Sequence, residues 1–259
     1  YLAEQLRNTD CEIVYIDLSQ ASLKVAQQRA ANRSLTNIRW IHGSLLDLPN
    51  LEVGQFDYIN CVGVLHHLEN PTDGLLALRE VLKSDGAMRL MVYGKYGRAG
   101  VYAIQDLMQR INKDDPDPRQ NVDRTKRILS ELPRTNWYMR GMNRESMLKT
   151  FVEDDNNLYD TFLHSQDRAY TVPELYEWLE SCELNLNSFT NYNCTQMEKL
   201  KYLPQMKVLD PIVRSRINNL PIREQQAIAE LITGDMSLHT FYVSFRRKTA
   251  ATPQDLNNV

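Results

Sequence analysis

The chain has 259 residues, of which 42% are hydrophobic and 24% are charged, so it suits one large globular α/β domain or a domain with an insertion. Its net charge of −3 gives no overall field that would favour a nucleic acid or an anionic membrane as a partner. No apolar run approaches the roughly 20 residues that span a bilayer, and the five histidines form no HxxxH or HExxH metal-binding pattern. The four cysteines show no CxxC spacing, which indicates free, mostly buried thiols in a reducing cytoplasm.

The first part of the chain alternates between short apolar strands and helices. Its strand-like runs are almost continuously apolar, which suits parallel strands that are covered on both faces. Strands and helices that alternate at this spacing predict an α/β fold with a doubly wound, Rossmann-like and mostly parallel sheet. In chain order we expect the end of a helix at 1–7, strands at 11–16, 38–41, 56–64 and 87–93, a helix at 20–33 capped by Ser19, a helix from Asn70-Pro71 to 82, and a turn at Asp85-Gly86.

The pattern changes after Gly94. Residues 95–149 carry 12 Lys or Arg against 7 Asp or Glu, and their periodicity indicates helices rather than sheet. The expected helices are at 99–111, 122–132, 145–151 and 173–182, the last capped by Thr171 or its neighbour, and the expected strands are at 186–192 and 239–245. We divide the chain into a core at 1–94, a helical insertion at 95–170 that would form the acceptor or lid region, the rest of the core at 171–248 with a helical insertion at about 195–234, and a disordered tail at 249–259.

Asp17 directly follows the strand expected at 11–16. This position is at the carboxyl edge of a parallel sheet, where doubly wound folds bind their ligands. A carboxylate there can accept both hydroxyl hydrogens of a ribose. Alternatively, Asp17 or Ser19 simply caps the helix that follows. The residues alone leave the two interpretations of Asp17 open.

A short polar loop, Gly43-Ser44-Leu45-Leu46-Asp47-Leu48-Pro49, follows the strand expected at 38–41. Such a loop can hold an adenine ring, because Asp47 would accept a hydrogen bond from the exocyclic amine while the leucines sandwich the ring. The alternative is a surface turn in which Asp47 caps a backbone amide.

The strand expected at 56–64 brings Val64, Leu65, His66 and His67 to the same edge of the sheet. The paired histidines could be structural, with one ring buried and the other capping a helix. They could also lie beside the reacting groups.

These three features follow successive strands in a fixed order, and here the sequence resembles the class I S-adenosylmethionine-dependent methyltransferases. In that family an acid after the second strand binds the ribose, matched by Asp17, and an acid after the third lies near adenine, matched by Asp47. An FD…VLHHL pattern is matched at 56–68, and the resemblance extends over residues 1 to about 111. It implies S-adenosylmethionine as cofactor and a last strand at 239–245 that inserts antiparallel. The cofactor-binding residues that it implies are Asp17, Leu18, Ser44, Leu46, Asp47, Val62 and Val64.

The glycine-rich loop of this family is missing from the sequence. In nucleotide-binding α/β folds the ribose acid lies about 20 residues after that loop, which places the loop just before Tyr1. We therefore expect an N-terminal truncation rather than a loop lost by mutation, and an additional domain upstream of Tyr1 remains open. Cofactor binding by the chain would then be weak, and its activity is an open question.

The implied reaction transfers a methyl group from a sulfonium that is already activated, so the protein mainly aligns the reactants and excludes water. A general base is needed only if the acceptor arrives protonated, and the candidates are His66, His67 and Tyr96. Tyr93, His67 and Arg98 are expected to contact the acceptor. The glycines at 94, 97 and 100 could present backbone amides to an anion, and with the positive charge of the insertion this predicts an acidic acceptor. The alternative is a flexible turn with solvated cations.

Three interpretations of the whole chain compete. The first is an active methyltransferase with an unidentified acceptor, a small molecule rather than a macromolecule. The second is a noncatalytic methyltransferase-like module that binds or scaffolds within a longer polypeptide. The third is a nicotinamide-dependent oxidoreductase, which we rank last because no Tyr-x-x-x-Lys pair follows the strand expected at 56–64.

Overall fold

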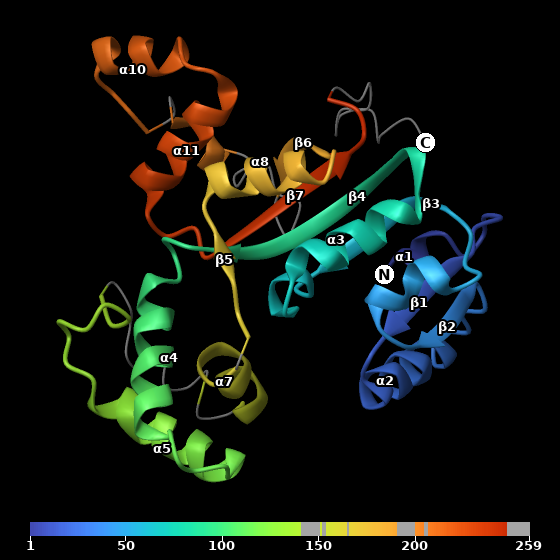
Figure 1. Ribbon diagram of the computed structural model, residues 1–259, viewed down its shortest axis with the longest axis horizontal. Coiled ribbons are helices and arrows are strands. Elements are labelled where there is room, and N and C mark those ends of the chain that lie inside the picture. Colours follow the sequence, from blue (N-terminus) through green and yellow to red (C-terminus); the bar gives the residue numbers. More distant parts are fainter. Residues whose placement is uncertain (141–150, 152–153, 165, 191–199, 205–206, 248–259) are drawn as a thin grey trace.

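The computed structural model describes all of the chain except residues 141–150, 152–153, 165, 191–199, 205–206 and 248–259 (Figure 1). Most of the helix expected at 145–151 and all of the tail expected at 249–259 lie outside the described residues. No helix of the described part is long and apolar enough to cross a membrane.

The N-terminal unit is a two-stranded parallel sheet with helices around it. Strand β1 pairs with β2 in a continuous register that runs from Ile13 opposite Ile38 to Asp17 opposite His42. Ser19 caps the intervening helix, as expected, because its hydroxyl accepts a hydrogen bond from the backbone nitrogen of Ser22 at 3.2 Å. The elements are α1 (Leu2–Gln5), β1 (Ile13–Asp17), α2 (Gln20–Ala31), β2 (Ile38–His42) and the 3-10 helix η1 (Leu45–Asn50).

The main sheet has the strand order β3-β4-β7-β6. Strand β3 runs parallel to β4, whereas β7 runs antiparallel to both β4 and β6, so the expected antiparallel C-terminal strand is confirmed. A short strand, β5, pairs parallel with the end of β4 at Tyr93 and Gly94. The strands are β3 (Phe56–Val62), β4 (Leu82–Gly94), β5 (Ala169–Tyr170), β6 (Asn185–Thr190) and β7 (Leu238–Ser244).

The turn expected at Asp85-Gly86 is part of a strand instead. Strand β4 already begins at Leu82, which pairs with Phe56, and the next pair along β3 joins Tyr58 to Ala87. The intervening residues of β4 therefore form a bulge. Gly86 permits it, because an added Cβ would lie 2.9 Å from the carbonyl oxygen of Phe56.

Two helices pack on the main sheet and are tied to each other. The indole nitrogen of Trp178 donates to the hydroxyl of Thr72 at 3.1 Å. Thr171 caps its helix in a full capping box with Glu174, which explains why the sequence marks this helix start so clearly. The elements between β3 and β6 on this side are η2 (Leu65–His67), α3 (Pro71–Glu80) and α8 (Val172–Ser181).

The residues between β4 and β5 fold around a hydrophobic core of their own, which includes the fully buried Ile104, Met108 and Leu158. Its helices lie together below the sheet in Figure 1, at one end of β4. They are α4 (Ala99–Ile111), α5 (Pro118–Glu131) and α7 (Asp155–Phe162). The elements between β6 and β7 are η3 (Leu200–Tyr202), α10 (Pro211–Asn218) and α11 (Ile222–Thr233).

Three of the four cysteines fall in the described part, and Cys11, Cys61 and Cys182 are free thiols there. Cys61 is buried, which raises the pKa of its thiol to about 12. Burial raises the pKa of Cys182 as well, so Cys61 and Cys182 pack as small apolar groups rather than as nucleophiles.

Candidate functional site

The loops that follow β2 and β3 are held together on one helix, α3. Gly74 of α3 makes this possible, because an added Cβ would lie 2.9 Å from Leu65, 3.3 Å from Leu45 and also against Leu68. Leu45 begins η1, and Leu65 begins η2. The glycine thus lets the loop of Asp47 and the loop of the paired histidines converge at one edge, formed by the carboxyl ends of β2 and β3, which belong to different sheets.

Asp17 lies at this edge, at the end of β1, and its carboxylate organises the local turn. Oδ1 accepts from the backbone nitrogen of Ser19 at 2.8 Å, and Oδ2 accepts from the hydroxyl of Tyr15 at 3.0 Å. The helix cap itself is Ser19, not Asp17. A carboxylate oxygen has more than one lone pair, so both oxygens can accept further hydrogen bonds from a ligand.

The sequence left open whether Asp47 caps the turn after β2 or binds a ligand, and the structure shows that Ser44 is the capping residue. The hydroxyl of Ser44 accepts from the backbone nitrogen of Leu46 at 3.2 Å and so caps η1. The exposed carboxylate of Asp47 has no hydrogen-bond or ion-pair partner within the described part of the chain. Because Ser44 caps the turn, the carboxylate of Asp47 is not needed for that role.

Large apolar side chains are exposed beside these acids. Leu18 is 74% exposed, Leu46 43% and Val64 39%. Val62 ends β3 half-buried, and Gly63 then turns the chain with a φ of +76°, a conformation that favours glycine. Apolar side chains that are exposed to solvent are suitable for packing against a flat ligand such as adenine.

His66 is buried beside β4, at 1% exposure, with its ring centroid 3.9 Å from that of Tyr93. Neither ring nitrogen has a hydrogen-bond partner among the described residues. The pKa of His66 is lowered to about 3, mainly by burial and further by nearby His67 and Arg98, while Asp167 opposes the shift. His66 is therefore a neutral ring at physiological pH.

His67 is partly exposed, and a backbone group fixes its orientation. Its Nδ1 lies 3.1 Å from the carbonyl oxygen of Gln166. Its ring centroid lies 4.3 Å from those of both His66 and His164, with the rings tilted, and the ring meets Tyr93 edge-on at 5.6 Å. The structure thus brings His66, His67 and Tyr93 together, whereas the side chain of Tyr96 is exposed.

Arg98 is buried, so for this residue the alternative of a flexible turn with solvated cations is wrong. Its guanidinium donates to the carboxylate of Asp167 at 2.8 Å, with side-chain exposures of only 9% and 2%, and it stacks 3.6 Å from the ring centroid of Tyr93. Burial by itself would lower the pKa of Arg98, but the Asp167 carboxylate raises it above its usual value. The Tyr102 hydroxyl and the Gln105 amide donate to the same carboxylate at 3.1 and 3.2 Å.

Sequence reasoning missed Asp167, Tyr102 and Gln105. One signal was present for part of this group, because Arg98, Tyr102 and Gln105 recur at helical spacing on the otherwise apolar face of α4. Nothing in the local sequence around Asp167 marks it as their partner.

The glycines at 94, 97 and 100 serve close packing of the backbone. An added Cβ at Gly94 or Gly97 would collide with the backbone of Met236, and one at Gly100 would lie 2.6 Å from Cα of Tyr138. The amide of Gly94 already donates to the carbonyl of Ser237 at 2.9 Å, so it is not free to bind an anion.

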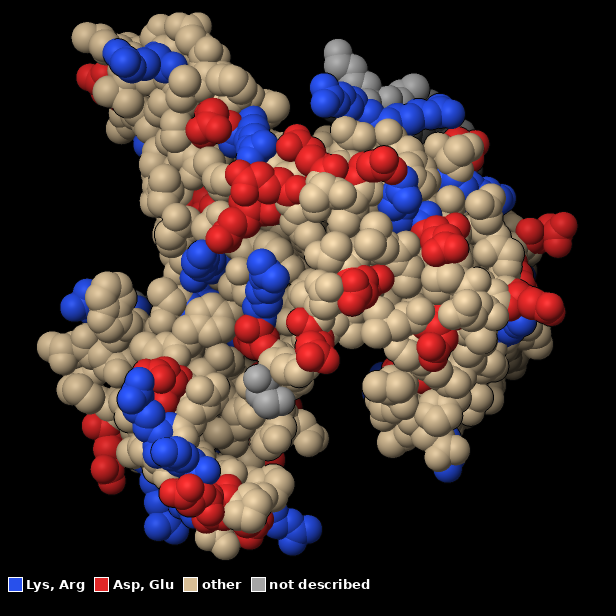
Figure 2. Space-filling model, in the orientation of Figure 1, with Lys and Arg blue, Asp and Glu red and all other residues tan. Residues whose placement is uncertain are grey.

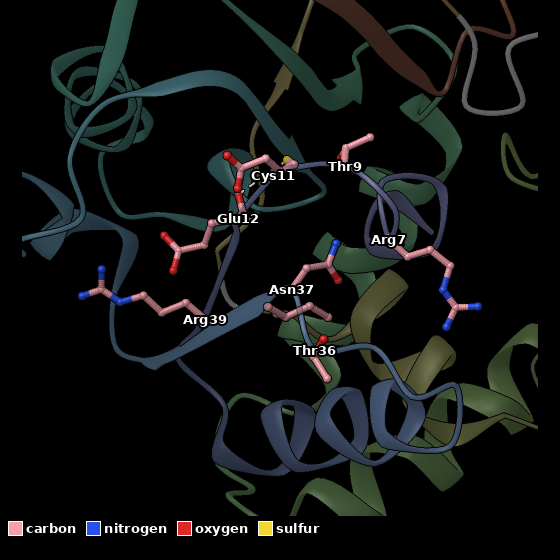
Figure 3. Close-up of a pocket in the computed structure, with 9 residues that line it drawn as sticks. Arg7, Thr9, Cys11, Glu12, Thr36, Asn37 and Arg39 are labelled. Carbon is pink, nitrogen blue, oxygen red and sulfur yellow. Dashed lines mark hydrogen bonds between the residues drawn. The ribbon is translucent and has the colours of Figure 1, made fainter.

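The carboxyl edge of the sheet faces a notch in the surface. Figure 2 shows this notch below α3, between the helices α4 to α7 and the unit formed by β1, α2 and β2. A separate open pocket of about 400 Å³ lies at the opposite, amino ends of β1 and β2, lined by polar side chains that include Arg7, Glu12, Asn37 and Arg39 (Figure 3). Because this pocket lies at the opposite ends of the strands, it is not part of the candidate site at Asp17 and Asp47.

Known proteins match this chain, some over its core and others over most of its length. A family model described as a methyltransferase domain matches residues 1–88. An uncharacterized protein of Synechococcus sp. is 30% identical over 238 residues, which are 91% of this chain and 55% of that protein. The ubiquinone biosynthesis O-methyltransferase of Acinetobacter baylyi is 23% identical over 103 residues, which are 40% of this chain and 43% of that protein.

Among solved structures, PKMT2 from Rickettsia typhi in complex with AdoHcy superposes with a TM-score of 0.65 at 17% identity, covering 90% of this chain and 44% of that one. At this identity the likeness shows the fold alone. The chain spans about half the length of these relatives.

Proposed function

We propose that this chain, whose residues 1–88 form a methyltransferase domain of the class I S-adenosylmethionine-dependent type, binds S-adenosylmethionine at the carboxyl edge of its sheet and methylates a small molecule. The observation that carries the proposal is the set of side chains there. Asp17 and Asp47 lie beside the exposed apolar side chains of Leu18, Leu46 and Val64. This combination of acids and apolar walls fits a nucleoside, with its hydroxyls and amine on the acids and its flat ring between the apolar groups.

The roles of the residues follow from their geometry. Asp17 would hold the ribose hydroxyls, and the Ser19 and Tyr15 hydrogen bonds keep its carboxylate in one orientation. Asp47 would accept from the adenine amine. When bound, S-adenosylmethionine supplies a methyl group on a positively charged sulfur that is already a good leaving group, so the protein's main tasks are alignment and exclusion of water.

The acceptor would occupy the region next to His67 and Tyr93, where η2 meets the helices that follow β4. Two comparisons support methyl transfer in general terms. The distant Acinetobacter relative is an O-methyltransferase, and PKMT2 was solved with AdoHcy. The chain spans only about half the length of such proteins. The molecule that the whole protein methylates is therefore proposed here and is not taken from these relatives.

Calorimetric titration with S-adenosylmethionine and with AdoHcy tests the proposal. We expect both to bind the whole protein, and NAD not to bind. A protein that binds neither sulfur compound would be a noncatalytic module with this fold, and a protein that binds NAD instead would be an oxidoreductase. To separate an enzyme from a module that merely binds cofactor, radiolabel from S-adenosyl-[methyl-³H]methionine is followed into small molecules of a deproteinised cell extract.

A further inference from the structure

We propose that the hairpin of α10 and α11 is the interface of a homodimer, in which α10 of each copy packs against α11 of the other. The inference goes beyond the proposed function and does not depend on it. It arises from apolar and charged side chains that the two helices leave exposed, at the opposite end of the molecule from β1 and β2 (Figure 1).

Helix α10 is almost uncovered by its own chain. Ile217 is the single buried residue among its eight. A helix this short is unstable in water without tertiary packing. Its start is nevertheless well encoded, because Pro211 lies in the first turn and the carboxylate of Asp210 accepts from the backbone nitrogen of Val213 at 2.8 Å. A helix that the sequence specifies and its own chain leaves uncovered is expected to pack against a partner.

The outer side of α10 carries an apolar stripe with one cation in it. Leu209, Ile212, Val213 and Arg216 follow one another at i, i+3, i+4 and i+7, so they share one side of the helix. All four are exposed, Ile212 by as much as 80%. An open hollow of about 510 Å³ lies along Ile212 and Arg216, into which side chains of a partner can insert.

The outer side of α11 carries the counterpart, an apolar stripe with one anion. Glu224, Ile228, Leu231 and Ile232 follow one another at i, i+4, i+7 and i+8. Ile228 is half-buried, and the other three are exposed. Glu230, on the opposite side of the helix, is buried in the chain itself, so the stripe is the side of α11 that remains for a partner.

The two stripes match when both are measured from the turn at Leu220-Pro221 that joins the helices. Arg216 lies four residues before Leu220, and Glu224 lies four residues after it. If α10 packs antiparallel on α11 of a second copy whose turn lies at the same end, positions equally far from the turn face each other. The facing positions are Arg216 and Glu224, Ile212 and Ile228, and Leu209 and Leu231.

A two-fold axis along the hairpins forms this contact twice, because the same surface of each copy then meets the other. The product is a four-helix bundle, in which helices joined by short loops pack around a shared apolar core. The exposed apolar side chains of both helices are then covered together.

The charges select a second copy as the partner. Neither Arg216 nor Glu224 has an ion-pair or hydrogen-bond partner within the part of the chain that the structure describes. Arg214 belongs to the other side of α10, where its Nε donates to the carbonyl of Val208 at 2.9 Å. One cation and one anion leave the face without net charge, so an anionic lipid surface has no charge there to bind. Opposite charges at matched positions instead complement those of a second copy.

Sedimentation velocity of the whole protein over a range of concentrations tests the inference, and we expect a monomer–dimer equilibrium. Ile212→Glu should leave the protein monomeric, because it places a carboxylate in the apolar part of the interface. Val25→Glu is the matched control and should leave the dimer unchanged. Val25 is also an exposed apolar residue of a helix, but it lies on α2 at the other end of the molecule (Figure 1).

Exchanging the two charges tests the pairing itself. Arg216→Glu and Glu224→Arg should each raise the dissociation constant of the dimer by about tenfold or more, because each places like charges opposite each other twice. The variant with both substitutions should return the dissociation constant close to that of the wild type. This recovery would also show that the single variants are folded and fail only to pair.

A protein that sediments as a monomer at every concentration would overturn the inference. The face would then belong to another part of the polypeptide or, if the monomer also binds vesicles of phosphatidylglycerol, to a lipid surface. A dimer that persists in Ile212→Glu would place the interface elsewhere and overturn it too. A doubly exchanged variant that pairs no more tightly than the single variants would contradict the pairing of α10 with α11.

Discussion

The guanidinium of Arg98 and the carboxylate of Asp167 form an ion pair of 2.8 Å that is almost completely buried where α4 meets the edge of the main sheet. Arg98 begins α4, and Asp167 precedes β5 by two residues, so the pair ties the helices after β4 to the strand that follows them. The charge of Arg98 is therefore used inside the protein. An acidic acceptor, which the sequence suggested partly through Arg98, must find its cation elsewhere.

Arg98→Ala should lower the free energy of unfolding by about 3–5 kcal/mol, because it leaves the Asp167 carboxylate buried without its counter-charge. Urea denaturation measures the loss. Arg110→Ala is the matched control, because Arg110 pairs with Asp106 at the surface and its removal should change stability little. Equal effects of the two substitutions would show that the Arg98 pair is solvated.

His66→Phe should make the protein less sensitive to acid. In the unfolded chain His66 binds a proton near its ordinary pKa of 6.5, but in the folded protein only near 3. The unfolded state therefore binds more protons below pH 6.5, and folding stability falls as the pH drops from there towards 3. His66 alone should cost the wild type about 2 kcal/mol of stability between about pH 7.5 and pH 5.

The same substitution also removes two buried nitrogens that lack partners. At pH 7.5 we expect His66→Phe to be neutral or stabilising, by up to about 1–3 kcal/mol. Thermal and urea unfolding of both proteins across this pH range measure the difference. Parallel pH profiles for wild type and variant would mean that His66 is protonated as easily in the folded protein as in the unfolded chain.

Gly97→Ala should destabilise the protein by about 1–3 kcal/mol or more, since the added methyl group meets the backbone of Met236 and Ser237 and cannot be relieved by a side-chain rotation. Gly43→Ala is the control, because its methyl group would lie 3.9 Å from the nearest atom, Cγ2 of Ile41. Comparing the urea midpoints of the two variants tests this. Unchanged stability of Gly97→Ala would place the segment that precedes β7 farther from Gly97.

Asp47→Ala should weaken S-adenosylmethionine binding by about 0.5–1.5 kcal/mol through loss of one hydrogen bond. Stability should not change, because the carboxylate is exposed and holds no described neighbour. Calorimetry measures the affinity, and thermal unfolding without ligand is the control. If Ser44 only caps η1, Ser44→Ala should have the opposite effect and lower the stability of the protein more than its affinity for S-adenosylmethionine.

Much of this architecture could be predicted because its signals are local. The helix at 99–111 and the capping role of Thr171 are each written within a few residues, and the structure confirms both. The strand-end acids Asp17 and Asp47 were located in the same way, by strands that end beside them.

The remaining features depend on contacts between distant residues. Asp167 meets Arg98 across 69 positions, and the Gln166 carbonyl meets His67 across 99, so no window of sequence contains either pair. The bulge in β4 was mistaken for a turn because Asp85-Gly86 has turn composition, while the pairing with β3 that extends the strand to Leu82 is nonlocal.

The affinity of Asp17→Ala for S-adenosylmethionine, measured by calorimetry against the wild-type full chain, tests the central claim most directly. We predict a loss of about 1.5–3 kcal/mol, or roughly tenfold to 150-fold. Asp17→Asn, which can still accept from the Ser19 amide, should also bind weakly because it lacks the charge, whereas Asp57→Asn at the far end of β3 should bind as the wild type does. Wild-type affinity in Asp17→Ala would contradict a ribose site and leave Asp17 as a residue that only shapes its own turn.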